Sequence, residues 1–182
     1  MKNTFVIIGI VFVAFFIGCA EEDNTFLIAE NSVGPLEKSS PISAIESIFR
    51  HDSIVKDTMS SKVGASSNKI QIFEKGGLPL LVLTPNTDSI PSTENIQILD
   101  YRYQAENGIG LLSTFEDIQD QYTIKKVVTT LNSLVVFPKG SNLYFTIDKT
   151  ELPYNLRFTN SKIEAVQIPD EAKIKYLMLS WD

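Results

Sequence analysis

The chain has 182 residues, with 22 acidic against 16 basic side chains and a formal net charge of −6 at neutral pH. This excess of acid repels the phosphate backbone of nucleic acids, whose binding proteins need clustered Lys and Arg. We therefore expect that the protein does not bind nucleic acid. The length suffices for one domain, or for two small fused ones, with a real hydrophobic core.

The N-terminus has the layout of a secretory signal peptide. An unbroken apolar stretch at residues 5–17 follows Lys2 and precedes Gly18. A positive end, a short apolar middle and a small residue before a cut are typical of such signals. A transmembrane anchor, the alternative, needs roughly 20 apolar residues to cross about 30 Å of hydrocarbon, and this stretch is shorter. We expect residues 1–18 to be removed.

Residues 16–19, Phe-Ile-Gly-Cys, resemble the lipobox of bacterial lipoproteins, in which lipid is attached to the cysteine sulfur before cleavage. Phe16 stands where that family usually has Leu, and an ordinary signal peptide with an incidental cysteine is the alternative. Cys19 is the sole cysteine in the sequence, so no internal disulfide competes for it. The resemblance implies stable anchoring to a membrane, which takes two or more acyl chains.

Residues 20–23, Ala-Glu-Glu-Asp, form an acidic run directly after Cys19. This run resembles the surface-export signal of lipoproteins in Bacteroidota, and a solvated tether is the alternative. Residues 24–32 lack clear periodicity, so we expect residues 19–32 to be a lipidated tether to the fold. The expected location is the cell envelope, anchored by lipid to the outer membrane and either facing the periplasm or exposed on the surface.

Two parts of the remaining sequence resemble each other. The matched segments, in chain order, are 40–49 with 113–122, 54–55 with 127–128, 70–76 with 134–140, 80–83 with 144–147, and 94–97 with 161–164. Pieces in the same order at nearly the same spacing predict a duplication. The expected units are residues 33–105 and 106–182.

Each unit opens with the pattern of a short helix. Ser40 is a suitable N-cap, with Pro41 at the first helical position, where a missing N–H costs nothing. Ser113 followed by Glu116 predicts a capping box in the second unit. Apolar positions recur at helical spacing along one face, at Ile42, Ile45, Ile48 and Phe49 in the first unit and at Phe115, Ile118 and Tyr122 in the second.

Strand patterns follow each helix. The turn-forming segments 75–77 and 139–141 lie between apolar runs, as in hairpins. Further strands are expected to contain Ile96, Ile98, Tyr101 and Tyr103, residues 163–168, and residues 174–179. The sequence therefore predicts an α+β fold of two tandem repeats, each a short amphipathic helix packed on an antiparallel β-meander.

Such tandem units are similar to those of outer-membrane assembly lipoproteins of the BamE/SmpA type and of the β-lactamase-inhibitor protein. The pattern Gly-x-Gly-Leu-Leu-Ser-Thr-Phe at residues 108–115 also resembles a recurrent element of exported lipoproteins. The resemblance implies the fold alone, because a fold does not assign a function.

Few residues could carry enzyme chemistry. His51 is the sole histidine and lies just past the first expected helix, where a cation meets the helix dipole. Zinc sites need several Cys or His ligands, and the sequence has no calcium-binding loop. Acids on the second expected helix favour its dipole, namely Glu116, Asp117 and Asp120. We predict no cofactor and no metal.

Residues 152–158 have no good counterpart in the first unit, where residues 84–92 are polar and turn-forming. They combine two aromatic residues with an arginine, types that interface hot spots favour. Tyr154, Arg157 and Phe158 are therefore the candidate partner-binding residues. Core packing of Tyr154 and Phe158 is the alternative.

The leading hypothesis is a non-enzymatic lipoprotein that binds an envelope protein or another envelope component through its sheet. The alternative is a carboxylate-dependent hydrolase acting on an envelope or extracellular polymer, because paired carboxylates cleave glycosides without metal or histidine. An inhibitor-like binder is a third hypothesis. A deep cleft with converging acids would favour the hydrolase, and a shallow face with exposed aromatics would favour a binder.

Overall fold

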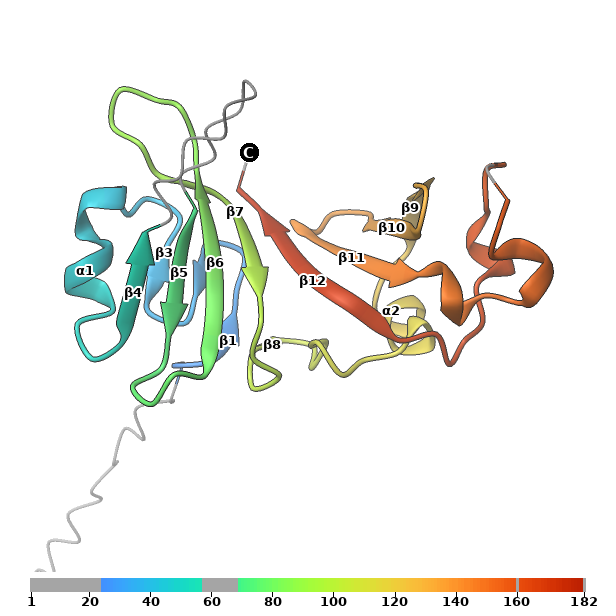
Figure 1. Ribbon diagram of the computed structural model, residues 1–182, viewed down its shortest axis with the longest axis horizontal. Coiled ribbons are helices and arrows are strands. Elements are labelled where there is room, and N and C mark those ends of the chain that lie inside the picture. The colour runs from blue at the N-terminus through green and yellow to red at the C-terminus, as the bar shows by residue number, and fades with distance from the viewer. Residues whose placement is uncertain (1–23, 57–68, 160, 182) are drawn as a thin grey trace, which may run out of the picture.

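The computed structural model describes residues 24–56, 69–159 and 161–181. The expected signal peptide, Cys19 and the acidic run after it lie outside the described residues. The fold is α+β, as predicted, with short helices beside two sheets (Figure 1). No helix in the described part of the chain is long and apolar enough to cross a bilayer.

The larger sheet has eight strands, all paired antiparallel, in the order β4-β5-β6-β7-β12-β11-β10-β9. The strands of its first half are β4 (Ser53–Lys56), β5 (Ile70–Phe73), β6 (Pro79–Pro85) and β7 (Thr93–Ile98). Those of its second half are β9 (Ile124–Thr129), β10 (Ser133–Pro138), β11 (Leu143–Asp148) and β12 (Ile174–Ser180). The two halves meet where β7 pairs with β12.

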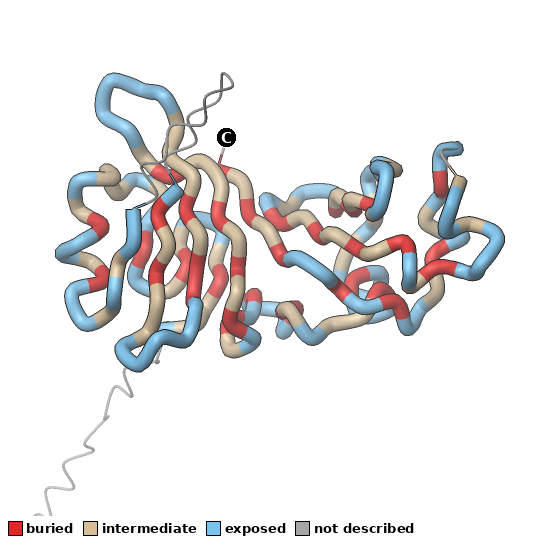
Figure 2. Tube along the Cα trace, viewed as in Figure 1, coloured by how far each residue is buried: buried red, intermediate tan, exposed pale blue. Residues whose placement is uncertain are grey.

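One face of this sheet carries the core. The paired positions in one row across seven strands are buried, namely Ile72, Leu81, Ile98, Leu177, Phe145, Val136 and Val127. Residues between the buried ones keep part of their surface exposed, as Figure 2 shows along the strands. This alternation follows from the two-residue period of a strand.

The helical segments are short, and their apolar positions face the core as predicted: Ile45, Phe49, Phe115 and Ile118 are buried, and Ile42, Ile48 and Tyr122 are partly buried. The first is a 3-10 turn, η1 (Ile42–Ala44), continued by α1 (Ile45–Ile48), and the second is α2 (Phe115–Gln121). Ile45 and Ile118 are fully buried.

The predicted caps are wrong in both helical segments. Pro41, in an extended conformation, precedes η1 without a side-chain cap, because it forms a bridge with Ser92 rather than starting a helix. Thr114, not Ser113, caps α2, and Asp117 completes the capping box. The capping pattern of the second helix is therefore correct in kind and shifted by one residue.

A smaller sheet has the order β3-β2-β1-β8, formed by β1 (Leu27–Ile28), β2 (Ser32–Val33), β3 (Leu36–Glu37) and β8 (Gln104–Ala105). Ile28 is 3% exposed, and the Trp181 indole donates a hydrogen bond to the Glu30 carbonyl at 3.1 Å. The prediction that residues 24–32 only link the lipid to the fold is therefore wrong. Pairing with residues distant in sequence, which no local periodicity records, makes this segment part of the fold.

The strand predicted through Tyr103 is correct for Ile96 and Ile98, which lie in β7, and wrong beyond them, and the strand predicted at residues 163–168 is wrong. Residues 174–179 are in β12 as predicted. Tyr101 and Tyr103 lie beyond the end of β7, because the Asp100 carboxylate accepts a hydrogen bond from the Arg102 amide at 2.8 Å and turns the chain. Residues 163–168 hold a 3-10 turn, η4 (Ala165–Gln167), with Glu164 and Gln167 as its capping box. β7 pairs with β6 and β12, and residues 161–164 form no strand, so the match of 94–97 with 161–164 fails.

Candidate partner-binding surfaces

The middle of the second face of the large sheet carries little charge, and the Asp148–Lys175 ion pair lies at its edge at the end of β11. Its central row is Val55, Gln71, Val82, Gln97, Met178, Tyr144, Phe137 and Lys126, flanked by Tyr176, Thr146, Val135 and Val128 on one side and by Thr84, Asn95 and Ser180 on the other. We call these residues the open face. Lys126 is the one ionised side chain among them at neutral pH, although the chain as a whole is rich in charge.

The middle of the open face is held by side-chain contacts. The rings of Phe137 and Tyr144 stack with centroids 5.5 Å apart and an interplanar angle of 16°. The Lys126 ammonium lies 4.5 Å from the Phe137 ring centroid, and the Tyr144 hydroxyl donates a hydrogen bond to Asn95 Oδ1 at 3.1 Å. These contacts fix the rings in place before any partner arrives, which lowers the entropy lost on binding.

A shallow cavity adjoins these rings. It has a volume of about 460 Å³ and is lined by Asn95, Phe137, Ser141, Asn142, Leu143, Tyr144 and Ser180. Its lining carries hydroxyl and amide groups beside apolar surface and has no acid. Such a lining suits recognition by hydrogen bonds and contact area, not acid–base chemistry.

The candidate residues Tyr154, Arg157 and Phe158 lie on a protrusion after β11, within and next to the 3-10 turn η3 (Tyr154–Leu156). Tyr154 is 76% exposed and Phe158 is 78% exposed, against the alternative of core packing. Their rings meet edge to face at a centroid distance of 5.8 Å. Arg157 Nε donates a hydrogen bond to the Leu152 carbonyl at 2.7 Å, so the arginine holds the turn itself.

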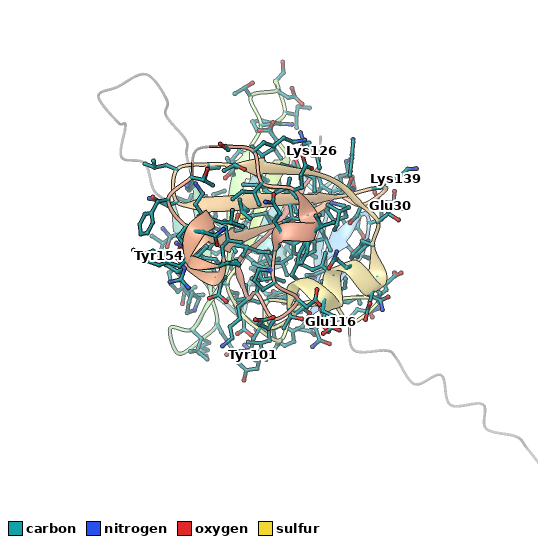
Figure 3. The ribbon with its side chains drawn as sticks, turned by 90° about the vertical axis from the view of Figure 1, so that its right-hand side faces the viewer. Glu30, Tyr101, Glu116, Lys126, Lys139 and Tyr154 are labelled. Atoms are coloured by element: carbon teal, nitrogen blue, oxygen red, sulfur yellow. The ribbon has the colours of Figure 1, made fainter. Side chains whose placement is uncertain are left out.

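The protrusion is fastened to the end of β11 by charged side chains. Lys149, only 3% exposed, donates a hydrogen bond from Nζ to the Thr159 carbonyl at 2.7 Å. Asp148 accepts one from Lys175 Nζ at 2.7 Å and another from the Thr150 amide at 3.0 Å. The Lys175 ammonium, followed by the Thr150 amide, lowers the pKa of Asp148 to about 2. The exposed rings therefore stand on an anchored base (Figure 3).

The remaining sequence-derived candidates are spread out. His51 is exposed, and its Nε2 accepts a hydrogen bond from Arg50 Nε at 3.0 Å. Glu116 and Asp120 are exposed on α2, and Asp117 is used in its cap. Within the described ranges, no group of three or more His, Cys, Asp or Glu residues could hold a metal ion.

Two acids share a cavity at the junction of the two sheets. Glu30 and Glu106 line a space of about 270 Å³ between the small sheet and the β10–β11 turn. This is the position that the hydrolase alternative would use. Backbone and amide groups, together with apolar residues such as Tyr122 and Leu143, form the rest of the lining.

A charge cluster around Arg102 was not predicted from the sequence. The guanidinium bonds Asp100 at 2.8 Å and Glu74 at 3.0 Å, and lies 4.2 Å from the centre of the Phe26 ring. Hydrogen bonding to Arg102 lowers the pKa of Asp100, while burial, followed by the nearby Glu74 charge, raises the pKa of Asp52. The only local sign of this cluster in the sequence was the Asp-Tyr-Arg turn at residues 100–102. The groups that contact the Arg102 guanidinium come from three separate segments of the chain.

The fold and these surfaces define a class: an α+β protein with an eight-stranded antiparallel sheet, one face of which is left uncovered by the described elements. The structure is similar to the crystal structure of the uncharacterized protein YfeY from Escherichia coli, with a TM-score of 0.51 and 14% sequence identity. The match covers 84% of this chain and 97% of YfeY, and shows a shared fold. No protein-family model and no curated protein matches the sequence.

Proposed function

We propose that the protein is a non-enzymatic binding module of the bacterial cell envelope, anchored by lipid on Cys19 to the outer membrane. Its open face takes up an envelope protein or another envelope component. The observation that carries this proposal is the composition of the open face, where Lys126 is the sole charged group among the fifteen positions named above and the Asp148–Lys175 ion pair lies at the edge. A sheet face that stays in water normally carries many charges.

The chemistry of the open face supports an interface. Protein–protein interfaces are depleted in charge at their centre and enriched in aromatic residues and Met. Tyr144, Phe137 and Met178 lie together at the middle of the central row. Partly exposed side chains of this kind bury apolar area when a partner covers them, at about 25 cal/mol per Å².

We also propose that the two halves of the sheet descend from a duplicated unit. The strand order supports this idea, because it runs β4-β5-β6-β7 in one half and, mirrored about the β7–β12 pair, β12-β11-β10-β9 in the other. A helical segment precedes each set of strands. The protrusion that carries Tyr154 is then an insertion between the third and fourth strands of the second unit.

The binding role can be tested by photo-crosslinking in intact cells that make the lipidated protein. A photoreactive residue at Gln97 or at Val135, both on the open face, should give the same defined adduct. The exposed positions Thr87 and Gln119, outside that face, serve as controls. Adducts from the controls alone, or from every position equally, would contradict the proposed site.

Affinity then provides a second measurement. Gln97→Lys buries a charge in the proposed interface, so it should weaken binding of the captured partner by more than about 30-fold. Gln119→Lys makes the same chemical change on exposed surface and should leave affinity unchanged. Thermal unfolding of both variants checks that the fold is retained.

The anchor has its own test. Cys19→Ala should move the protein from the membrane fraction to the soluble fraction, because it removes the site of lipidation. A variant that stays fully in the membrane fraction would overturn the lipoprotein assignment without bearing on the open face.

A further inference from the structure

The chain enters the fold at one end of the first half of the molecule. Phe26 contacts the Tyr103 ring edge to face at a centroid distance of 5.1 Å, and its carbonyl accepts a hydrogen bond from the Gln104 amide at 3.0 Å. The Arg102 guanidinium covers the Phe26 ring. The path of the chain is therefore fixed from Phe26 onward.

Two exposed apolar residues adjoin this entry point. Arg102 bonds Glu74, and the Glu74 amide donates a hydrogen bond to the Leu78 carbonyl at 2.8 Å, which brings the β5–β6 turn beside Phe26. Leu78 is 58% exposed, and Tyr101, next to Arg102, is 61% exposed. Figure 3 shows Tyr101 at the lower end of the molecule, and in Figure 1 the β5–β6 turn lies at that end too. We call this end the entry pole.

The charges of the entry pole are paired in part. Arg102 bonds both Glu74 and Asp100, and Asp52 lies close enough to Glu74 for its pKa to be raised by that charge. The acidic run at residues 20–23 precedes this end of the fold in the sequence. The two exposed apolar side chains are suited to the headgroup layer of a bilayer, where Leu and Tyr are stable.

The distance to the anchor is short. Cys19 precedes Asn24 by five residues, and a fully extended chain spans at most about 3.5 Å per residue, or about 17 Å in total. A domain of about 150 residues has a radius of gyration of about 15 Å, so its diameter exceeds that reach. The anchored lipid therefore keeps the entry pole nearest to the bilayer.

We propose that the entry pole is a membrane-facing surface, on which Leu78 and Tyr101 contact the phospholipid headgroup layer. This proposal rests on the proposed lipidation of Cys19. The opposite end of the first half, at the loop between β6 and β7, points away from the bilayer, since β6 alone spans about 20 Å. The open face then stands along the membrane normal and stays accessible to a partner from the side.

A fluorescence experiment on the lipidated full-length protein tests the orientation. Because the thiol of Cys19 is acylated and the sequence has no other cysteine, a new cysteine is a unique labelling site. Leu78→Cys and Tyr101→Cys place an environment-sensitive fluorophore on the entry pole. Ile90→Cys, 76% exposed in the β6–β7 loop, is the matched control.

Each labelled protein is reconstituted into phosphatidylcholine vesicles that contain a lipid with a doxyl quencher near its headgroup. We expect marked loss of fluorescence at positions 78 and 101 and none at position 90. Equal quenching at all three positions, or none at positions 78 and 101, overturns the proposal.

Flotation of the vesicles separates this result from a failure of the anchor. Protein that floats with the vesicles but shows no quenching at positions 78 and 101 is anchored in another orientation, which discards the membrane-facing pole alone. Protein that does not float lacks a functional anchor, which overturns both the lipoprotein assignment and the orientation built on it.

Discussion

Tyr154 and Phe158 are large aromatic residues that the fold leaves in solvent. Their rings contact each other, and their exposure of 76% and 78% means that truncation removes little buried area. We expect Tyr154→Ala and Phe158→Ala each to change the free energy of unfolding by less than about 1 kcal/mol. If the rings anchor a partner, the same changes should weaken binding by more than about 2 kcal/mol.

The neighbouring Leu152, which is 1% exposed, provides the control for that prediction. Leu152→Ala should cost about 2 to 5 kcal/mol of stability, measured by urea denaturation of the domain without lipid. A clear fall in the melting temperature for Tyr154→Ala or Phe158→Ala, with unchanged affinity per folded molecule, would remove the protrusion from the binding surface.

Asp148 should make stability depend on pH at the base of the protrusion. Its pKa in the folded protein is about 2, below the ordinary value of 3.8, so its stabilising contribution is complete above about pH 4. That contribution is lost as the pH falls from about 4 to about 2. Asp148→Asn keeps an acceptor for the Thr150 amide and removes the charge, and it should cost about 1 kcal/mol at neutral pH because the ion pair is partly exposed.

Urea denaturation at several pH values checks this prediction. The difference between wild type and Asp148→Asn should shrink as the pH is lowered toward 3 and beyond. A difference that stays constant over this range would mean that the charge of Asp148 does not stabilise the fold.

The helical segments are held by a few buried side chains. Both Ile45 in α1 and Ile118 in α2 are fully buried, although α1 has only four residues. Isolated helices this short are not stable in water, so packing must hold them in place. Ile45→Ala and Ile118→Ala should each cost about 2 to 5 kcal/mol in urea denaturation. The exposed Ile90 is the control, and Ile90→Ala should stay within about 0.5 kcal/mol.

The helices and most strands could be predicted because their signal is local. The spacing of Phe115 and Ile118, and the alternation from Leu143 to Asp148, report which side of each element is buried. Cap positions were harder, since Ser113 and Thr114 are both good capping residues and the tertiary setting chose the second. The short strand at Leu27–Ile28 exists because it pairs with Gln104–Ala105, a contact that no local pattern contains.

The candidate surfaces also divide into features that local sequence records and features that depend on tertiary structure. The two aromatic residues of the protrusion could be found in the sequence because they lack a counterpart in the first unit, but their exposure could not. The open face depends on strand register, since Gln97 and Met178 become neighbours only when β7 pairs with β12. The match of 94–97 with 161–164 concealed that pairing.

At the scale of the whole molecule, the final strand lies in the middle of the large sheet. β12 pairs with β7 on one side and with β11 on the other, so it joins the two halves. Deletion of residues 174–181 should expose both strand edges and abolish cooperative unfolding, seen by circular dichroism together with aggregation in gel filtration. If the shortened chain stays monomeric and unfolds cooperatively, the halves fold independently.

Trp181, the residue after β12, is joined to β7 and to the N-terminal segment. Its amide donates a hydrogen bond to the Glu94 carbonyl at 2.7 Å, and its indole closes the N-terminal segment at Glu30. Contacts between residues so distant in sequence form slowly, because loop-closure entropy must be overcome first. A secreted chain emerges from a translocation channel with its N-terminus first. If the proposed signal peptide exports this chain, we expect the fold to be completed only after β12 has left the channel, so that the earlier residues stay competent for threading until then.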